Sequence, residues 1–435
     1  MPSPLVFADN FFRITESGSS VRREVLAGVT TFLTMCYIIA FNPVLLAKAG
    51  MDQGTVFVAT CLVAALGTML IGFMTNYPIA LAPGMEVNAY FAMVVCVGMG
   101  VDWRVALAAA FVSGCLLLLL GLVKLRDSIV HGIPFSLQIA ISAGIGLFLA
   151  KIALENAGIP IGGASSVMFD DLRVPEAWLI ACGFALILVM HAFRISGAIL
   201  ISIFLITVLA SVLGLNELHG VVDTPSSFQP VLLELDFGGL FSPEMAGVIF
   251  IFCLLIMFNN VGTLIGVTNH AGLLKDGKLP RLKGVMTANS TAIVAGGALG
   301  ASPSVVYVES VAGISAGGRT GLTAIVVAFL FLLSLFFFPL VQHVPHYATT
   351  PALLYVAMLM MQQLGKIDWQ DIAETIPACL TIVCMPFTHS IANGIAAGFI
   401  SFALVKCLTG SARQVSGIVW IVSLLWIFKF IYWGV

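Results

Sequence analysis

Long apolar runs separated by short polar stretches fill most of this chain. Windows of about 20 apolar residues recur along nearly its whole length, and a helix of that length crosses roughly 30 Å of hydrocarbon. The alternation over about ten residues that is typical of a membrane β-barrel is absent. Because backbone polar groups in lipid must be satisfied internally, the pattern predicts an all-α polytopic membrane protein.

The apolar windows give the positions of the expected helices. They are predicted at 24–47, 54–75, 78–98, 103–123, 135–157, 176–193, 196–214, 243–267, 284–300, 302–317, 320–342 and 348–363. Three further apolar segments follow at 371–388, 391–408 and 416–434. Counting all three as spans gives an odd total, so one of them is expected to enter the membrane without crossing it. The polar stretch before Arg22 is not a secretory signal peptide, because it lacks an apolar core.

Composition supports the membrane interpretation and excludes several functions. Apolar residues make up 60% of the chain and charged residues 9%, with a mean hydropathy of +1.08, whereas a soluble domain carries about 25% charged residues. The nine cysteines are scattered singly with no CxxC, which favours packing over disulfides or metal ligation. No HExxH, GxSxG or P-loop motif occurs. We therefore expect no enzyme activity, no cofactor, no metal and no nucleic-acid partner.

The placement of lysine and arginine predicts the orientation in the membrane. With the N-terminus inside, the inner loops hold Arg13, Arg22, Arg23, Lys124, Arg126, Arg194, Lys275, Lys278, Arg281, Lys283, Arg319 and Lys366, and the outer loops hold only Lys48, Arg104 and Arg173. Cytoplasmic loops carry an excess of these residues. The N-terminus is therefore predicted to be cytoplasmic, in a multi-pass protein of a bacterial-type inner (plasma) membrane.

Two of the predicted helices are interrupted at matching places. The third helix carries Pro83 and Gly84 near its start, and the tenth carries Pro303 beside small residues. They lie seven crossings apart, so the second half would be an inverted copy of the first, a plan in which paired broken helices mark a binding site at mid-membrane. Each proline is expected in the first helical turn, where its missing N–H costs nothing. The alternative is that both are simple kinks.

Carboxylates within apolar segments predict where ligand chemistry occurs. Glu86 and Glu309 each follow one of the two breaks, and a charge at membrane depth is costly enough to suggest function. In the eighth helix, Asn259 and Thr263 are four residues apart and share a face. The alternatives are structural hydrogen bonds for the carboxylates and ordinary interhelical contacts for the polar residues. Thr34 would bond either a ligand or its own backbone.

Several motifs resemble the AzgA-like branch of the nucleobase–cation symporters. They are REVLAGVTTFLTM at 23–35, LAPGM at 81–85 with NAYF at 88–91, VGTLIGV at 261–267, and YVES at 307–310 leading to AGGRTGL at 316–322. The similarity extends from about residue 10 to 432. It implies transport of a purine base such as adenine, guanine or hypoxanthine, usually with protons.

The resemblance also implies the architecture. Relatives have a seven-plus-seven inverted repeat of fourteen helices, with half-helices at three and ten that are each preceded by a short extended segment. They also have an elevator motion of a core against a gate, and they are often dimers. The implied regions are a cytoplasmic segment at 1–21, core helices one to four at 22–125, gate helices five to seven with an external loop at 126–242, core helices eight to eleven at 243–342, and gate helices twelve to fourteen at 343–435.

This chain departs from that branch at three polar positions. Relatives usually have Gly at the position of Glu86, Asp or Glu at Asn259, and commonly Asp at Asn289, whereas Glu309 matches. A carboxylate has therefore been lost from the eighth helix, and another has been gained in the third.

The broken helices and their carboxylates predict a secondary active transporter, and the resemblance implies that it imports guanine, hypoxanthine or adenine with protons. Backbone N–H groups near Gly84 and Ser304 would donate to a flat heterocycle, Glu309 would accept from its N–H groups, and Glu86 would carry the proton. The alternative is a different small nitrogenous heterocycle or a cationic solute in the same fold. The predicted substrate-binding residues are Glu309, Glu86, Asn259, Thr34, Gly84, Asn88, Ser304 and Thr263, and the predicted proton-coupling residues are Glu86 and Glu309.

Overall fold

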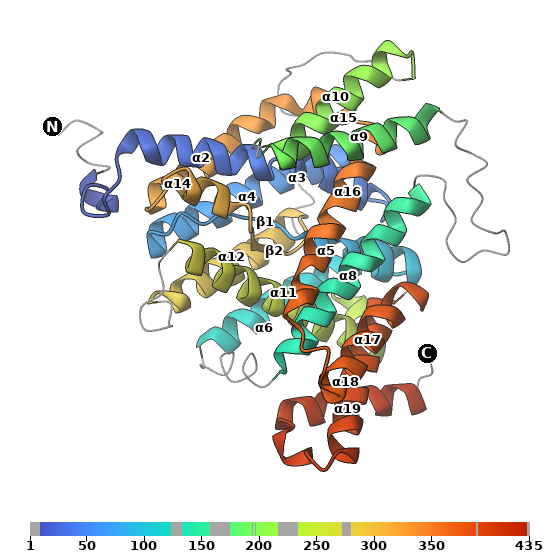
Figure 1. Cartoon of the computed structure of the whole chain (residues 1–435). Coiled ribbons are helices and arrows are strands. Elements are labelled where there is room, and N and C mark those ends of the chain that lie inside the picture. The colour runs from blue at the N-terminus through green and yellow to red at the C-terminus, as the bar shows by residue number, and fades with distance from the viewer. Residues whose placement is uncertain are drawn as a thin grey trace. The chain divides into compact units, whose positions relative to one another are not determined.

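A computed structural model describes residues 9–122, 133–156, 175–193, 195, 197–215, 234–271, 280–388 and 390–432. Within these residues the chain is mostly helical, with one two-stranded sheet (Figure 1). Some residues used above to predict orientation, namely Lys124, Arg126, Arg173, Arg194, Lys275 and Lys278, lie outside the described residues.

The first half of the chain contains the first strand and the helices around it. In chain order the elements are α2 (Val21–Met35), α3 (Tyr37–Ala47), α4 (Gln53–Thr75), β1 (Leu81–Pro83), α5 (Met85–Ala89), the π-helix η1 (Tyr90–Gly98), α6 (Trp103–Leu122), α8 (Phe135–Asn156), α9 (Pro175–Ala192) and α10 (Ala198–Val212). A π-helix is a rare element that is frequently found at functional sites.

The second half begins with a short 3-10 turn and contains the second strand. Its elements are η3 (Gly238–Phe241), α11 (Pro243–His270), α12 (Leu282–Leu299), β2 (Ser304–Val306), α13 (Ser310–Ser315), α14 (Gly321–Ser334), η4 (Leu335–Phe337), α15 (Phe338–Gln342), α16 (His346–Met361), η5 (Gln362–Lys366), α17 (Ile372–Phe387), α18 (Ile391–Leu408), η6 (Ala412–Gln414) and α19 (Gly417–Tyr432).

Several helical segments are long and apolar enough to span a membrane. In the described part of the chain six meet both conditions: Val21–Ala47, Gln53–Thr75, Trp103–Gly121, Phe135–Glu155, Pro175–Ala192 and Gly321–Gln342. Shorter apolar helices, including Met85–Gly98 and Glu244–Met257, lie between them. The prediction of a helical membrane protein with many apolar segments is confirmed.

The structure corrects the predicted position of the two prolines. Pro83 is the last residue of β1 and precedes Gly84, the N-cap of α5, whereas Pro303 precedes β2 by one residue. Neither proline lies in a helical turn, so that prediction is wrong. A proline cannot donate to a strand ladder, and here it stands where a short strand ends or begins. The tenth helix is correspondingly shorter than predicted and begins at Ser310.

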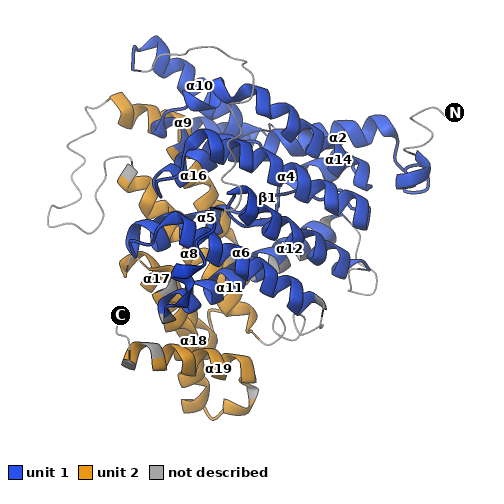
Figure 2. Cartoon of the chain, turned by 180° about the vertical axis from the view of Figure 1, so that it is seen from behind, with its two compact units in different colours: residues 1–123, 185–349 blue, residues 124–184, 350–435 orange. Residues whose placement is uncertain are grey.

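The described chain divides into two compact units, which Figure 2 shows in different colours. The first contains residues 1–123 and 185–349, and the second contains 124–184 and 350–435. The predicted core and gate regions concern movement rather than packing, and they stay a prediction.

In the first unit the helices surround the strand pair. Helix α4 packs against α12 and α14, and α2 packs against α13 and α14. An apolar cluster that includes Leu81 and Val306 of the strands, with Ile71, Leu264 and Ala292 of three helices, encloses the pair. The strands therefore lie in the interior of this unit, away from water.

In the second unit four helices, α8, α17, α18 and α19, pack together. Helix α17 packs against α8 and α18, and α18 also packs against α8 and α19. Ile139, Ala140 and Ala143 of α8 meet Ala378 and Ile382 of α17 in an apolar cluster. This unit is held by ordinary apolar helix contacts.

Candidate functional site

The strand pair brings two distant segments together. Strands β1 and β2 are antiparallel, with Leu81 opposite Val306 and Pro83 opposite Ser304. The Gly84 N–H donates to the Pro303 carbonyl at 3.0 Å, and the ladder continues at its other end, where the Tyr307 N–H donates to the Ala80 carbonyl at 3.0 Å. The register therefore fixes the positions of the first residues of α5 and α13, the helices that follow the two strands.

Side chains satisfy the outer edges of this two-stranded sheet. Thr68 of α4 bonds both backbone groups of Leu81, since its Oγ1 lies 2.9 Å from the Leu81 nitrogen and 2.9 Å from the Leu81 oxygen. Asn260 Oδ1 of α11 accepts from the Val306 N–H at 2.8 Å, and the Tyr307 hydroxyl donates to the Pro83 carbonyl at 2.7 Å. An unpaired strand edge is not tolerated inside a membrane, and these contacts provide the missing partners.

Glu86 lies in the first turn of α5 and is held by the neighbouring α11. The side-chain amide of Asn259 donates to Glu86 Oε2. The Thr263 hydroxyl, one turn further along α11, donates to Asn259 Oδ1 at 3.4 Å. The amide is thereby fixed at both ends, so its N–H groups point at the carboxylate. The structure brings together three of the predicted site residues in this chain of contacts.

Glu309 lies at the N-cap of α13 and is held from the other side, by α3. The Tyr37 hydroxyl donates to Glu309 Oε1 at 2.8 Å. Tyr37 is buried, with 3% of its surface exposed, whereas Glu309 is partly exposed and the preceding Val308 is 54% exposed. Glu309 is therefore partly accessible while its partner lies in the core.

The two carboxylates share one electrostatic property. Among the described residues, neither Glu86 nor Glu309 forms an ion pair with a lysine, arginine or histidine. Each is bonded by a neutral donor, and each retains a second carboxylate oxygen. The register places them beyond opposite ends of the strand ladder. Two uncompensated acceptors thus flank one short sheet, and both can receive N–H groups or protons.

The other predicted site residues occupy more structural positions. Thr34 donates to the backbone carbonyls of Thr30 and Thr31, at 3.1 and 2.8 Å, so it bonds its own helix. Asn88 is fully buried and its amide donates to Asn42 Oδ1 at 2.7 Å, while Asn42 donates to Thr60. These contacts tie α5 to α3 and α4.

Gly84 and Ser304 lie at one end of the strand ladder. The Gly84 N–H donates within the ladder, to the Pro303 carbonyl, and ligand binding by backbone N–H groups near these two residues stays a prediction. Ser304 is fully buried, and its Oγ has no hydrogen-bond partner among the described residues. Tyr90 and Phe91 pack on the Phe252 ring, at centroid distances of 5.1 and 6.4 Å, and both are at most 1% exposed. They are core residues.

Sequence reasoning missed the aromatic residues of this site. Tyr37 and Tyr307 both donate within it, but a tyrosine in an apolar run looks like an ordinary packing residue. The available signal is the hydroxyl, because a buried tyrosine usually bonds a polar partner. Thr68 was missed because threonines in membrane helices often bond their own backbone.

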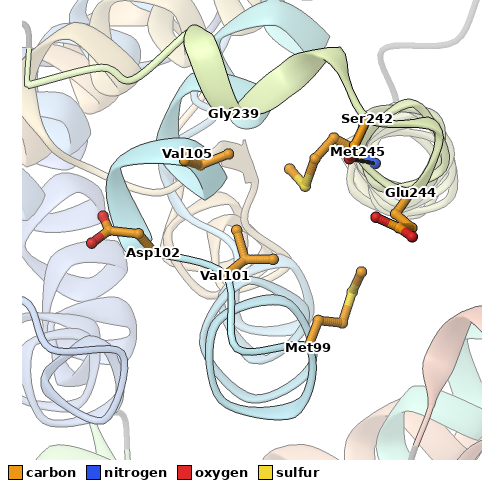
Figure 3. Close-up of a pocket in the computed structure, with 8 residues that line it drawn as sticks. All are labelled: Met99, Val101, Asp102, Val105, Gly239, Ser242, Glu244 and Met245. Carbon is orange, nitrogen blue, oxygen red and sulfur yellow. Dashed lines mark hydrogen bonds between the residues drawn. The ribbon is translucent and has the colours of Figure 1, made fainter.

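A separate cavity of about 440 Å³ lies at one end of the same helices (Figure 3). Its lining includes Met99, just beyond η1, together with Val105 of α6 and Met245 of α11. Its polar residues cap helices: Asp102 Oδ1 accepts from the Arg104 N–H at 2.8 Å, and Ser242 Oγ accepts from the Met245 N–H at 3.3 Å. The cavity is lined by none of the predicted site residues.

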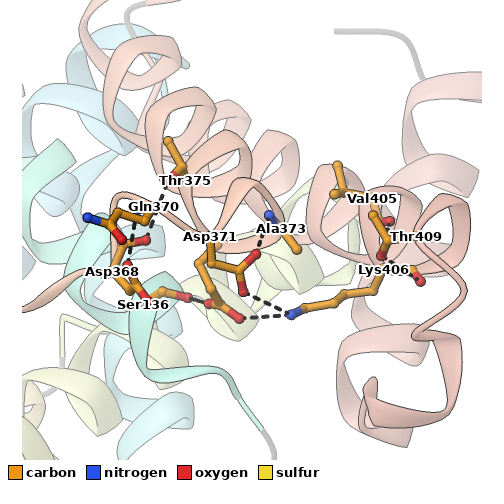
Figure 4. A network of polar contacts seen from close by, with 10 residues as sticks. Ser136, Asp368, Gln370, Asp371, Ala373, Thr375, Val405, Lys406 and Thr409 are labelled. Atoms are coloured by element: carbon orange, nitrogen blue, oxygen red, sulfur yellow. Dashed lines mark hydrogen bonds and ion pairs between the residues drawn. The ribbon is translucent and has the colours of Figure 1, made fainter.

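The second unit contains a different kind of polar cluster (Figure 4). Lys406 of α18 lies 3.1 Å from Glu374 Oε1 of α17 and 3.8 Å from Asp371 Oδ2. The Ser136 hydroxyl at the start of α8 donates to the other Glu374 oxygen. Lys406 compensates the carboxylates here, and the cluster joins the ends of α8, α17 and α18.

Comparisons with known proteins identify relatives along nearly the whole chain. The model of a permease family matches residues 22–397. The adenine permease AdeP of Escherichia coli K12 is 44% identical, over 98% of this chain and 96% of the relative. The guanine/hypoxanthine permease PbuO of Bacillus subtilis strain 168 is 39% identical, over 95% of this chain and 98% of the relative.

A solved structure shares the fold at low sequence identity. The transmembrane domain of the cyanobacterial bicarbonate transporter BicA matches with a TM-score of 0.66 and 16% identity. The match covers 86% of this chain and 97% of that domain. The likeness establishes a helical membrane-transporter fold and carries no information on the substrate.

Proposed function

We propose, from the premise that this chain belongs to the xanthine/uracil permease family, that it imports a purine nucleobase with protons. The comparisons confirm the family predicted from the motifs, and they confirm that the chain is a membrane transporter rather than an enzyme. The observation that supports the finer proposal is the pair of partly exposed carboxylates, each bonded only by a neutral donor.

Substrate recognition follows from the free oxygens of these carboxylates. With Oε2 of Glu86 bonded by Asn259 and Oε1 of Glu309 bonded by Tyr37, one oxygen of each remains to accept from a ring N–H or an amine. Hydrogen bonds to charged acceptors are about twice as strong as neutral ones. A base with two adjacent donors, such as the N1–H and 2-amino group of guanine, therefore suits the site better than a base rich in acceptors.

Proton coupling is assigned to Glu86 and the main substrate contact to Glu309. A carboxylate without a compensating cation in a low-dielectric site costs free energy, and a proton or a ligand donor removes that cost. Glu86 would take a proton outside and release it inside. Transport would follow an elevator motion in a seven-plus-seven repeat, with β1–α5 and β2–α13 as the equivalent half-helix segments.

Orientation, membrane and assembly complete the proposal. Arg13, Arg22, Arg23 and Arg319 all lie in segments predicted to be cytoplasmic, which supports an inside N-terminus in the inner membrane. A homodimer is proposed from the family alone. A second candidate function, transport of a small cationic solute in the same fold, is favoured by the absence of a compensating cation at both carboxylates within the described residues.

A thermal-shift screen of the purified protein tests the substrate. Purines, pyrimidines and small amines would be compared at two pH values. We expect guanine or hypoxanthine to raise the unfolding temperature, because a ligand that binds only the folded state stabilises it. Stabilisation by amines alone would replace the purine assignment with the cationic one. No stabilisation by any base at either pH would contradict both the substrate class and the role of the carboxylates.

A further inference from the structure

The N-terminal segment, residues 9–20, is tied to one end of the first unit. Asn76, the C-cap of α4, donates to the Phe12 carbonyl at 2.7 Å. Ser19 donates to the Gly317 carbonyl at 3.4 Å, just before α14. Phe12 and Ile14 are 6% and 1% exposed. The segment is therefore docked on the helix ends rather than extending away from them.

Glu24 secures the same end from within. Its carboxylate is fully buried and accepts from the Arg319 N–H at 2.9 Å, the Thr320 N–H at 3.2 Å and the Thr323 hydroxyl at 2.6 Å. The first turn of α14 is thereby capped by a side chain of α2. These bonds hold the segment of Arg22 and Arg23 next to the segment of Arg319.

Three arginines are exposed on this surface. Arg22, Arg23 and Arg319 are exposed, and within the described part of the chain none of them forms an ion pair. A Cβ built on Gly317 would lie 3.8 Å from Arg23 Cδ, so Arg23 packs over the segment that leads to Arg319. We call this surface, Arg22, Arg23 and Arg319, the arginine end.

The charges around the arginine end do not cancel. The adjoining described segments at 9–24, 281–284 and 316–321 contain the basic residues Arg13, Arg22, Arg23, Arg281, Lys283 and Arg319 and the acidic residues Asp9, Glu16 and Glu24. The Glu24 carboxylate already accepts three hydrogen bonds, and Glu16 lies 4.0 Å from Arg13. A positive excess therefore faces outward.

Large apolar side chains lie exposed beside these arginines. Phe11 is 52% exposed, Phe73 51% and Leu26 53%. The Phe11 ring lies 5.9 Å from the Phe73 ring, in an edge-on arrangement. Aromatic and basic side chains in neighbouring positions are typical of the boundary between hydrocarbon and headgroups. A soluble anion would explain the arginines and leave the exposed phenylalanines unexplained.

We propose that the arginine end is a binding site for anionic phospholipid headgroups. The guanidinium groups bind the phosphodiester, which they match in charge and in planar donor geometry. Phe11, Phe73 and Leu26 contact the adjoining acyl chains. Residues 316–320 connect α13, which has Glu309 as its N-cap, to α14. A bound lipid therefore also stabilises this connection.

Thermal unfolding in nanodiscs tests this site without reference to the substrate. The full chain is placed in phosphatidylcholine, alone or with increasing fractions of phosphatidylglycerol, and the unfolding temperature is followed. We expect anionic lipid to raise the temperature, with a smaller rise at high salt. In Arg22→Gln/Arg23→Gln the lipid fraction needed for half the effect should rise by about fivefold for each arginine removed.

Matched variants make the result specific to this surface. Arg22→Lys/Arg23→Lys keeps the charge and should retain most of the lipid effect, which also separates lipid binding from misfolding. Arg104→Gln removes an exposed arginine that is paired with Glu234, and it should respond like the wild type. An unchanged lipid response in the glutamine variant would overturn the site. So would full stabilisation by soluble glycerol phosphate in phosphatidylcholine alone, which would assign the surface to a free phosphate.

Discussion

Carboxylates in the two units of this protein have contrasting surroundings. In the first unit, Glu86 and Glu309 receive hydrogen bonds from an amide and a phenol, with no cation in the described residues close enough to pair with them. In the second unit, Glu374 receives a serine hydroxyl and lies 3.1 Å from Lys406. Glu86 and Glu309 therefore lack a compensating positive charge, whereas Glu374 has one.

The kind of partner distinguishes a functional carboxylate from a structural one better than burial alone does. A neutral donor orients a carboxylate without neutralising it, so a proton or an N–H group from a ligand still gains free energy by binding there. A lysine neutralises the group and leaves little for a ligand to add. Polar residues in membrane segments are often functional, and the nature of their partners indicates which ones are.

The largest expected effect comes from removing the Glu309 acceptor. Glu309→Gln keeps the shape but replaces one oxygen with a donor, which would face the N–H groups of the substrate. We expect base binding to weaken by more than about a hundredfold, measured by radiolabelled uptake and by thermal shift. Glu16→Gln makes the same change at an exposed side chain and is the control. Retained affinity in Glu309→Gln would make the Tyr37–Glu309 contact purely structural.

The next effect concerns stability in the second unit. Lys406→Met leaves Glu374 partly buried without its cation, and breaking such a pair costs about 3 kcal/mol. Unfolding in denaturing detergent should show this loss. In the double variant Lys406→Met/Glu374→Met most of the stability should return, since no uncompensated charge remains. Asp371 is 47% exposed on its side chain and is expected to contribute little.

A smaller and more specific change is expected from Glu86→Gln. Exchange of labelled for unlabelled base should continue, whereas accumulation driven by an inward proton gradient should be lost. For one coupled proton, each pH unit of gradient is worth about a tenfold accumulation. Proteoliposomes with a set internal pH separate the two measurements. Wild-type uptake that is indifferent to the gradient would refute the role given to Glu86.

The smallest effect is expected at Asn289. This residue of α12 is fully buried, and neither atom of its amide has a hydrogen-bond partner among the described residues. Asn289→Leu removes these groups and keeps the branched arrangement of the side-chain heavy atoms, so the free energy of unfolding should stay within about 1 kcal/mol of the wild type or rise. A marked loss of stability or of uptake would reveal a polar partner for Asn289 and place it with Glu86 and Glu309.

Most helices could be predicted because hydrocarbon imposes one simple rule on length and polarity. Short extended segments were expected before the third and tenth helices, but their pairing as strands was not, since Leu81–Pro83 and Ser304–Val306 are buried on all sides and their apolar residues look like helix interior. Only the prolines hinted at the interruption. Their exact position depends on a ladder between segments far apart in the sequence, which no local pattern encodes.

The site itself was predictable in part, for the same physical reason. Glu86, Glu309, Asn259 and Thr263 stand out in apolar sequence because burying them is costly. Their partners do not stand out: Tyr37 resembles any packed aromatic residue until the register brings Glu309 to its hydroxyl. The exchange of a carboxylate between the third and eighth helices, inferred from the family resemblance, corresponds in the structure to a direct contact between Glu86 and Asn259.

The strand pair has a consequence for how the protein is made. Pro83 and Ser304, which lie opposite each other, are about 220 residues apart, so at roughly 5–20 residues per second the ribosome needs on the order of 10–45 seconds to deliver the second strand. During that interval β1 lies in the membrane before its partner strand has been synthesised. Thr68 can already bond both backbone groups of Leu81, which protects part of the waiting segment during synthesis.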